Sequence, residues 1–399
     1  MSRWLLPLAV LWTLVLGGCR AERVEPAWRP PAKETVDYSR PLPPGALALR
    51  RLPPEQYPDF GPAFNDRAAL AEATNHSLAY LSRPSSQRYY PYGEISHARA
   101  VASLRAFLDV LAAADSPEQF DALLRQRFDV YQSVGYDDRG SVHFTGYYTP
   151  IFEGRKRPDA RFRYPLYELP PELVKDDEGR TLGRRLPDGR VVPCWTRRDI
   201  ERDGVLAGHE IAYLADPFEA YVATVQGSVK LRLADGQLWE LGYAGNNGHE
   251  YRSVGRLLVE SGAIGRNELS LGRMMEYFRA HPEQVPRYTW QNPRTVFFKP
   301  VSGGPFGSLN VPVTARRTIA TDKQVFPRAA LALVVAELPA RLGERIVEVP
   351  QTFFALDQDT GGAIRAAGRC DVYYGVGESA AELAGRVASD GRLYYLFVK

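Results

Sequence analysis

Hydrophobic positions between residues 67 and 127 recur every three or four places, which is the spacing of one face of an α-helix. The repeat is clearest over residues 95–114, where Ser96 stands at the N-cap position. A second helix is predicted from Ser116, because Pro117 and an acidic residue follow it and favour a helix N-terminus. The sequence therefore predicts a helical region before residue 128.

After residue 128 the apolar positions fall into short runs that are rich in β-branched and aromatic residues. Several of these runs, which include residues 220–233, A-Y-V-A-T-V-Q-G-S-V-K-L-R-L, are bounded by Asp-Gly or Asn-Gly pairs typical of hairpins. Helical spacing returns only over 253–263 and 269–281. Helices followed by strands predict an α+β or mainly β protein rather than a doubly wound sheet.

The first eighteen residues have the layout of a secretory signal peptide, with one Arg and then an apolar run from Trp4 to Leu16 that is too short to span a bilayer comfortably. The ending L-G-G-C resembles a bacterial lipobox, in which Cys19 becomes the lipidated first residue of the mature protein. An ordinary signal peptide that ends near a cysteine is the alternative. Because Arg20 rather than Asp follows the cysteine, we expect delivery to the periplasmic face of a Gram-negative outer membrane.

Prolines and charges dominate the segment that follows, so residues 19–58 are predicted to be an extended tether, at least in their first half. The 399 residues suffice for two domains, and a net charge of +3 is too small to indicate a nucleic-acid partner. Cys194 and Cys370 match no zinc or redox spacing; they could pair in an oxidising compartment or remain buried thiols. The six His form no metal motif of the H-E-x-x-H kind.

Three aspartates surround a glycine cluster in A-L-D-Q-D-T-G-G-A-I-R-A-A-G-R-C-D, namely Asp357, Asp359 and Asp371. A calcium loop counted from Asp357 would need oxygen ligands at positions 5 and 12, which are Gly361 and Gly368, so that interpretation is disfavoured. Turns between strands would also explain aspartates among glycines. The local pattern leaves their role open.

Generic nucleotide-binding and serine-hydrolase motifs are absent, but six short phrases are distinctive. They are G-Y-Y-T-P-I-F-E-G (146–154), V-Q-G-S-V-K-L (225–231), G-Y-A-G-N-N-G-H-E-Y-R-S-V-G-R (242–256), N-P-R-T-V-F-F (292–298), A-R-R-T-I-A-T-D (315–322) and D-T-G-G-A-I-R…D-V-Y-Y-G (359–375). Taken in this order, the phrases resemble the membrane-bound lytic murein transglycosylase A family, whose C-terminal part belongs to the three-aspartate cell-wall domains. The resemblance covers most of the chain from about residue 140 onward.

The resemblance implies a six-stranded double-psi β-barrel, a smaller β domain inserted into it, and a groove between the two. We place the insertion at 150–290, so that the barrel domain, with the N-terminal helices, is built from 59–149 and 291–399. It also implies an enzyme that cleaves the β-1,4 bond between N-acetylmuramic acid and N-acetylglucosamine in peptidoglycan, using the muramyl C6 hydroxyl in place of water. Its partners would be glycan strands and, through the lipid, the membrane; no metal or organic cofactor is implied.

The family's three aspartates correspond to Asp322, Asp359 and Asp371, of which the last matches the acid/base residue. An acid that acts near neutral pH needs a raised pKa, which burial or a neighbouring carboxylate such as Asp359 would provide. Asp357 has no family counterpart, and we expect it to be an exposed strand-edge or turn residue. Glu94 precedes a predicted helix and is explained as an acid stabilised by the helix dipole.

The family phrases also contain candidate groove residues, for each of which a purely structural role is the alternative. Gly361 and Gly362 are expected to allow close packing or a positive φ beside the site. The candidate groove residues are Tyr147, Tyr148, Thr149, Gln226, Asn247 and His249.

Two rival functions stay open at this point. A hydrolase would use Asp359 or Asp322 to activate water on the same substrate. A wall-binding lipoprotein would have the same barrel without catalysis.

Overall fold

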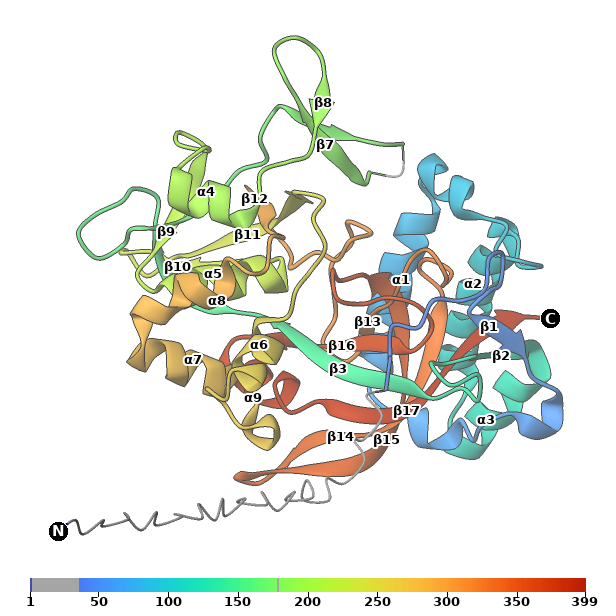
Figure 1. Cartoon of the computed structure of the whole chain (residues 1–399). Helices are drawn as coiled ribbons and strands as arrows, with labels where there is room; N and C mark the ends of the chain where they lie inside the picture. Colours follow the sequence, from blue (N-terminus) through green and yellow to red (C-terminus); the bar gives the residue numbers. More distant parts are fainter. Residues whose placement is uncertain (2–35, 178) are drawn as a thin grey trace. The chain divides into compact units, whose positions relative to one another are not determined.

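The computed structural model describes Met1, residues 36–177 and residues 179–399, and residues 37–399 form one compact unit. The predicted signal peptide and Cys19 lie outside the described residues. Within the compact unit, the barrel part and the inserted part each have a hydrophobic core of their own (Figure 1). No helix in the described residues is both long and apolar enough to cross a membrane.

Six strands close into a barrel in the order β3-β17-β14-β15-β13-β16, and β16 pairs back with β3. The pairs β16–β3 and β13–β15 are parallel, whereas the other pairs are antiparallel. This closed mixed barrel confirms the fold that the resemblance implies. The strands are β3 (Val142–Thr149), β13 (Thr318–Ala320), β14 (Leu331–Leu342), β15 (Arg345–Asp359), β16 (Arg369–Val376) and β17 (Ala388–Val398).

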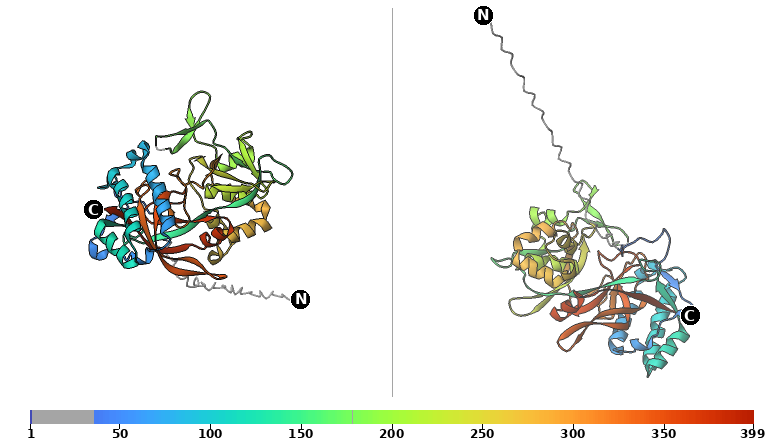
Figure 2. Two further views of the ribbon diagram at one scale, coloured as in Figure 1. Left: turned by 180° about the vertical axis from the view of Figure 1, so that it is seen from behind. Right: turned by 60° about the horizontal axis from the view of Figure 1, so that its bottom comes forward.

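Three N-terminal helices pack against the barrel on the side away from the insert (Figures 1 and 2). Ser96 accepts a hydrogen bond from the Arg99 N–H at 3.1 Å, and Ser116 accepts one from the Gln119 N–H at 3.2 Å, so both predicted caps are confirmed. Each cap satisfies a backbone donor that has no partner inside its helix. The helices are α1 (Arg67–Leu81), α2 (His97–Ala113) and α3 (Pro117–Arg127).

The predicted tether is too long at its C-terminal end. Leu49–Arg51 forms β1, which pairs antiparallel with β2 (Phe128–Ser133), and β2 in turn pairs with β17. The flanking Ala48 and Leu52 are buried in the barrel core. A few apolar side chains between the prolines are thus enough to attach this segment to the sheet.

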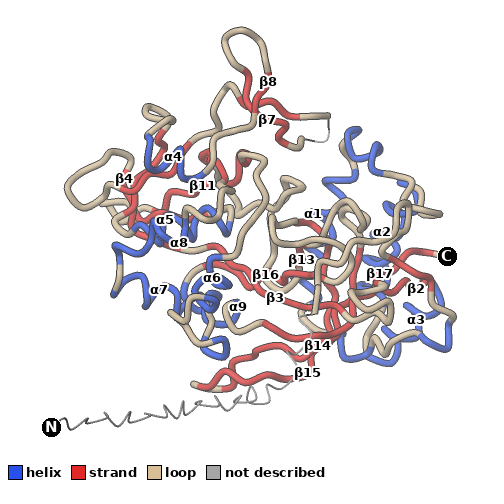
Figure 3. The backbone as a smooth tube through the Cα atoms, viewed as in Figure 1, coloured by secondary structure: helices blue, strands red, loops and turns tan. Residues whose placement is uncertain are grey.

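The insert contains a six-stranded sheet in the order β12-β11-β10-β4-β9-β5 and a separate three-stranded sheet, β6-β7-β8; Figure 3 shows these strands interleaved with helices. The strands are β4 (Ile151–Arg155), β5 (Tyr164–Tyr167), β6 (Leu173–Lys175), β7 (Thr181–Arg185), β8 (Val191–Val192), β9 (Glu210–Leu214), β10 (Val229–Arg232), β11 (Leu238–Asn246) and β12 (Val296–Pro300). The helices are α4 (Arg197–Asp203), α5 (Pro217–Gln226), α6 (Val254–Glu260), α7 (Leu271–Ala280) and α8 (Val285–Thr289).

Two predictions about the insert are wrong. Its sheet includes β12, which pairs with β11 and buries Phe298 in the insert core, so the insert extends past the predicted boundary at 290. The stretch 220–233 is a helix before it is a strand, because α5 begins at Pro217. Asp216 caps α5 by accepting hydrogen bonds from the backbone N–H groups of Phe218 and Glu219. The cap and the buried helix face outweigh the β-branched residues.

The last helix, α9 (Glu378–Ala384), packs directly on β3. Gly146 makes this approach feasible, because a Cβ there would lie 2.7 Å from the Ala384 Cα. The strand of the G-Y-Y-T-P phrase is therefore held from one side by α9 and from its edges by β16 and β17.

Candidate functional site

Asp371 and Asp359 are neighbours across a single residue of β13. Asp371 on β16 is the register partner of Ala320, and Asp359 at the end of β15 is the partner of the same alanine. Both aspartates and Ala320 line a cavity of about 400 Å³ whose wall is shared between the barrel and the insert. The barrel thus brings together two acids that stand twelve residues apart in the sequence.

The Asp371 carboxyl is only one-fifth exposed and faces few charges. Thr145, its register partner on β3, donates a hydrogen bond to Oδ1, and the Arg369 Nη2 lies 3.7 Å from the same oxygen. Arg369 also donates to the Thr145 hydroxyl at 3.0 Å. Burial raises the pKa of Asp371 to about 6, while Arg369 opposes the rise and Asp359 adds to it. Asp371 can therefore hold a proton close to neutral pH.

Asp359 has hydrogen-bond donors on both carboxylate oxygens. Oδ1 accepts from the backbone N–H groups of Ser308 and Thr360, each at 2.8 Å, and Oδ2 accepts from the Tyr147 hydroxyl at 2.9 Å. Burial raises the pKa of Asp359, and the three donors oppose that rise. Burial also raises the pKa of Tyr147 far above its ordinary value, so its hydroxyl keeps the proton that it donates.

Asp322 lies apart from these two acids and is absent from the cavity wall. Its side chain is buried, and its two oxygens accept hydrogen bonds from the backbone N–H groups of Gln324 at 3.0 Å and Ala366 at 2.8 Å. Ala366 has a positive φ of 60° in the loop that leads to Asp371. The third aspartate of the family phrases therefore holds a strained loop in place.

Asp357, predicted to be an exposed strand-edge or turn residue, lies on β15 and is 0% exposed. Its carboxylate forms an ion pair with Lys323 and accepts hydrogen bonds from the hydroxyls of Thr321 and Tyr395, each at 2.7 Å. β15 runs into the barrel interior at this point, and the lysine supplies the counter-charge that burial requires. The prediction is wrong because the partners are distant in sequence.

The tyrosines of the G-Y-Y-T-P phrase point to opposite faces of β3, as strand alternation requires. Tyr147 and Thr149 line the cavity, and the Thr149 hydroxyl lies 3.1 Å from that of Ser228 and 3.0 Å from that of Tyr373. Tyr148 instead lines a different hollow of the surface. Its backbone N–H donates to the side chain of Gln226, a cavity residue, at 3.2 Å.

Asn247 and His249 are brought close to the cavity but are not part of its wall. The buried Asn247 amide donates to the carbonyls of Trp195 and Pro293, at 2.9 and 2.8 Å, and its oxygen accepts from the Thr295 N–H. The His249 Nε2 lies 2.8 Å from the Cys194 carbonyl. Asn247 therefore joins the insert segments around residues 195 and 293, and His249 contacts the segment at residue 194.

Glu94 lies outside the cavity, is mostly exposed and accepts a hydrogen bond from Tyr131. Cys194 and Cys370 are both free and buried, so they do not form a disulfide with each other. Among residues 36–177 and 179–399, no group of three or more His, Cys, Asp or Glu side chains is arranged to hold a metal ion.

Gly362 has an ordinary φ, but a Cβ at this position would lie 2.7 Å from the Arg294 Nε. Of the two predicted reasons for glycine here, close packing is therefore the one that applies.

Several cavity residues were not predicted from the sequence. Arg294 belongs to the N-P-R-T phrase, which could have identified it. The further cavity residues are Arg294, Arg365, Tyr243, Tyr251, Phe306 and Ser308.

The chain was compared with protein-family models and with known proteins. Residues 143–299 match the family model described as the MltA specific insert domain, and residues 317–397 match the 3D domain. The membrane-bound lytic murein transglycosylase A of Escherichia coli K12 is 31% identical over 271 residues, which are 67% of this chain and 69% of that protein. That of Vibrio cholerae is 31% identical over 66% of this chain and 68% of its own length.

Solved structures of lytic murein transglycosylases have a similar fold. The membrane-bound lytic murein transglycosylase from Agrobacterium tumefaciens superposes with a TM-score of 0.73 and 26% identity, covering 88% of this chain and 98% of that one. E. coli MltA with bound chitohexaose superposes with a TM-score of 0.67 and 27% identity, covering 88% and 94%.

Proposed function

Because the chain belongs to the membrane-bound lytic murein transglycosylase A family, it is a lytic transglycosylase, and we propose that Asp371 performs the chemistry alone, first as an acid and then as a base. The substrate is the β-1,4 bond between N-acetylmuramic acid and N-acetylglucosamine in peptidoglycan. The product is a 1,6-anhydromuramyl end.

The proposed reaction needs one proton and no water. Protonated Asp371 gives its proton to the glycosidic oxygen while the bond from that oxygen to the muramyl C1 breaks. The muramyl C6 oxygen then bonds to C1, and its proton moves to the Asp371 carboxylate, which restores the acid. An internal nucleophile held beside C1 gains the advantage of a unimolecular step.

The observation that carries the proposal is the unequal state of the two neighbouring acids. The pKa of Asp371 is raised to about 6, so it suits both proton transfers near neutral pH. Both oxygens of Asp359 already accept hydrogen bonds, so this carboxylate is poorly placed to activate water. Asp359 instead raises the pKa of Asp371 and offers negative charge to an oxocarbenium-like transition state.

A digest of purified peptidoglycan tests the reaction. The proposal expects muropeptides with 1,6-anhydro ends, which are lighter by one water than the products of a hydrolase. Hydrolytic masses would refute the internal nucleophile. Unchanged turnover in Asp371→Ala would refute the assigned acid, and no turnover in the intact protein would favour the wall-binding lipoprotein.

We propose further that the protein is lipidated at Cys19 and acts from the periplasmic face of the outer membrane. The L-G-G-C sequence and relatives that are named membrane-bound support this location. Cys19→Ala should release the protein from the membrane fraction and abolish labelling by a palmitate analogue, and a labelled, membrane-bound Cys19→Ala would contradict the assignment.

A further inference from the structure

Two guanidinium groups in the cavity have no anionic partner. Arg294 comes from the insert, and Arg365 follows the D-T-G-G loop of the barrel. The Arg294 guanidinium makes one hydrogen bond, to the His249 carbonyl at 3.0 Å, and Arg365 bonds only to the carbonyls of Gly361 and Ile364. Within residues 36–177 and 179–399, neither side chain has a carboxylate within ion-pair distance.

The surroundings of Arg294 make its positive charge costly. Burial and the positive charge of Arg365 both lower the pKa of Arg294. A half-buried guanidinium with free N–H groups is satisfied best by a bidentate anion such as a carboxylate. The two cavity aspartates do not supply this anion. Asp359 accepts hydrogen bonds from Tyr147 and two backbone donors, and Asp371 accepts one from Thr145 and lies near Arg369.

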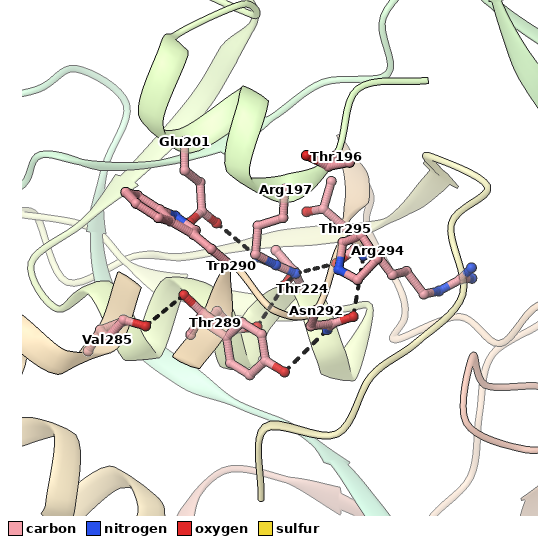
Figure 4. Close-up of polar contacts among 12 residues, drawn as sticks. Thr196, Arg197, Glu201, Thr224, Val285, Thr289, Trp290, Asn292, Arg294 and Thr295 are labelled. Carbon is pink, nitrogen blue, oxygen red and sulfur yellow. Dashed lines mark hydrogen bonds and ion pairs between the residues drawn. The ribbon is translucent and has the colours of Figure 1, made fainter. Parts of the chain in front are cut away.

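The backbone of Arg294 is hydrogen-bonded to a buried cluster of side chains, drawn in Figure 4. Arg197, at 1% exposure, donates from Nη2 to the Arg294 carbonyl at 2.7 Å and to the Thr224 hydroxyl at 2.8 Å. Its Nη1 forms an ion pair with Glu201 at 2.9 Å. The Asn292 side chain accepts the Arg294 N–H at 3.3 Å. In Figure 4 the Arg294 guanidinium extends away from this cluster.

The position of the guanidinium is fixed from the barrel side as well. Gly362 lies so close that a Cβ there would be 2.7 Å from the Arg294 Nε and 3.1 Å from its Cδ. A fully anchored main chain and a side chain packed on glycine leave the charged end little freedom. Such preorganisation is characteristic of recognition groups rather than of solvated surface charges.

We propose that Arg294, assisted by Arg365, recognises a carboxylate on the muramyl residue of the substrate. This inference rests on the proposed function, since it names the part of peptidoglycan that the groove distinguishes. The carboxylate is either the lactyl group of a peptide-free strand or an acid of the stem peptide. N-acetylglucosamine polymers carry neither, so the guanidiniums separate muramyl glycans from chitin-like ones.

The test measures binding in an Asp371→Asn background, where turnover does not interfere. Three probes are titrated: peptide-free glycan fragments, peptide-bearing fragments and neutral chitohexaose. Arg294→Met should weaken binding of at least one charged probe by about 10- to 100-fold. Chitohexaose binding should change by less than about twofold, which also shows that the groove is folded.

The pattern of losses identifies the carboxylate. A loss confined to peptide-free fragments indicates the lactyl group, and a loss confined to peptide-bearing fragments indicates the stem peptide; a loss on both supports the shared chemistry. An equal loss on all three probes, or no loss on any, overturns the proposal. Arg256→Met, which removes an exposed charge on α6 outside the groove, is the matched control and should change nothing.

A second variant keeps the test decisive if Arg294→Met does not fold. Arg365 is exposed and makes only backbone contacts, so Arg365→Met leaves both walls intact. It should weaken the charged probes by about two- to fivefold and leave chitohexaose unaffected. The binding experiment does not depend on turnover. Hydrolytic products from the wild-type digest would therefore refute the proposed reaction and leave the binding result for Arg294 and Arg365 unchanged.

Discussion

Two regions of the barrel bury a carboxylate in opposite ways. In the barrel interior, Asp357 has Lys323 and two hydroxyls around it, so both carboxylate oxygens have a donor. At the groove, Asp371 is buried with one hydroxyl and a guanidinium that stays 3.7 Å away. A counter-charge in contact with a buried carboxylate stabilises its ionised form, whereas burial without a counter-charge in contact raises the pKa and favours the protonated form. One acid therefore maintains the fold and the other is available for chemistry.

Removing the groove acid should give the largest effect. Asp371→Asn is expected to lower peptidoglycan turnover by about 10²- to 10⁴-fold, because the amide cannot donate the proton that the raised pKa of Asp371 keeps available. Chitohexaose binding should remain. Asp188→Asn, at an exposed loop position, is the control. Retained turnover in Asp371→Asn would remove the difference between the two regions.

Removing the interior cation should act on stability instead. Lys323→Met leaves Asp357 buried without its counter-charge and is expected to lower the free energy of unfolding by about 3–5 kcal/mol. Urea titration of the two proteins measures it. The double variant with Asp357→Asn should recover part of the loss, and a single variant as stable as the wild type would show that the pair is dispensable.

The groove acid should also cost stability at neutral pH. The folded pKa of Asp371, about 6, lies above its unfolded value of about 3.9, so the native state favours the protonated form. This preference contributes stability below about pH 4 and is lost as the pH rises through 6. Asp371→Asn should therefore be more stable than the wild type above pH 7, by up to about 3 kcal/mol, and equal to it near pH 4. Urea titrations at pH 4 and 8 decide this, and a variant that is less stable at pH 8 contradicts it.

The smallest effect should come from the hydroxyl that touches the groove acid. Thr145→Val removes a donor to the Asp371 carboxylate, so the pKa of Asp371 should rise further and the basic limb of kcat/KM should move to higher pH. Turnover should fall about 3- to 10-fold. Thr145→Ser should restore both quantities, and a variant with reduced turnover but an unmoved pH profile would indicate a packing role alone.

Local signals predicted the elements that are locally determined. The caps at Ser96 and Ser116 follow from near neighbours in the chain, and the structure confirms them. The failure at α5 is instructive, since Asp216 and Pro217 carried a cap signal that β-branched residues outweighed in the prediction. β1 was hidden in a proline-rich segment because its partner strand begins far along the chain.

Site residues could be predicted where a titratable side chain stands inside one of the family phrases. The family resemblance predicted Asp359 and Asp371 as site residues, and the structure shows that both line one cavity; their catalytic roles stay predictions. Asp357 was misjudged because its lysine stands 34 residues upstream, in the turn that follows β13. Arg294 and Arg365 stand in the family phrases N-P-R-T and D-T-G-G-A-I-R, but that they lack an anionic partner can be seen only once their neighbours in space are known.

The barrel closes through strands that are synthesised at very different times. Thr145, which donates to Asp371, is the register partner of Ala388 as well, so β3 has its full set of neighbours only once β17 has been made. The whole insert is translated between these two strands. A ribosome-bound chain that ends before β17 therefore lacks an assembled acid site, and a glycan-cleaving activity built on this barrel stays latent until translation is nearly complete.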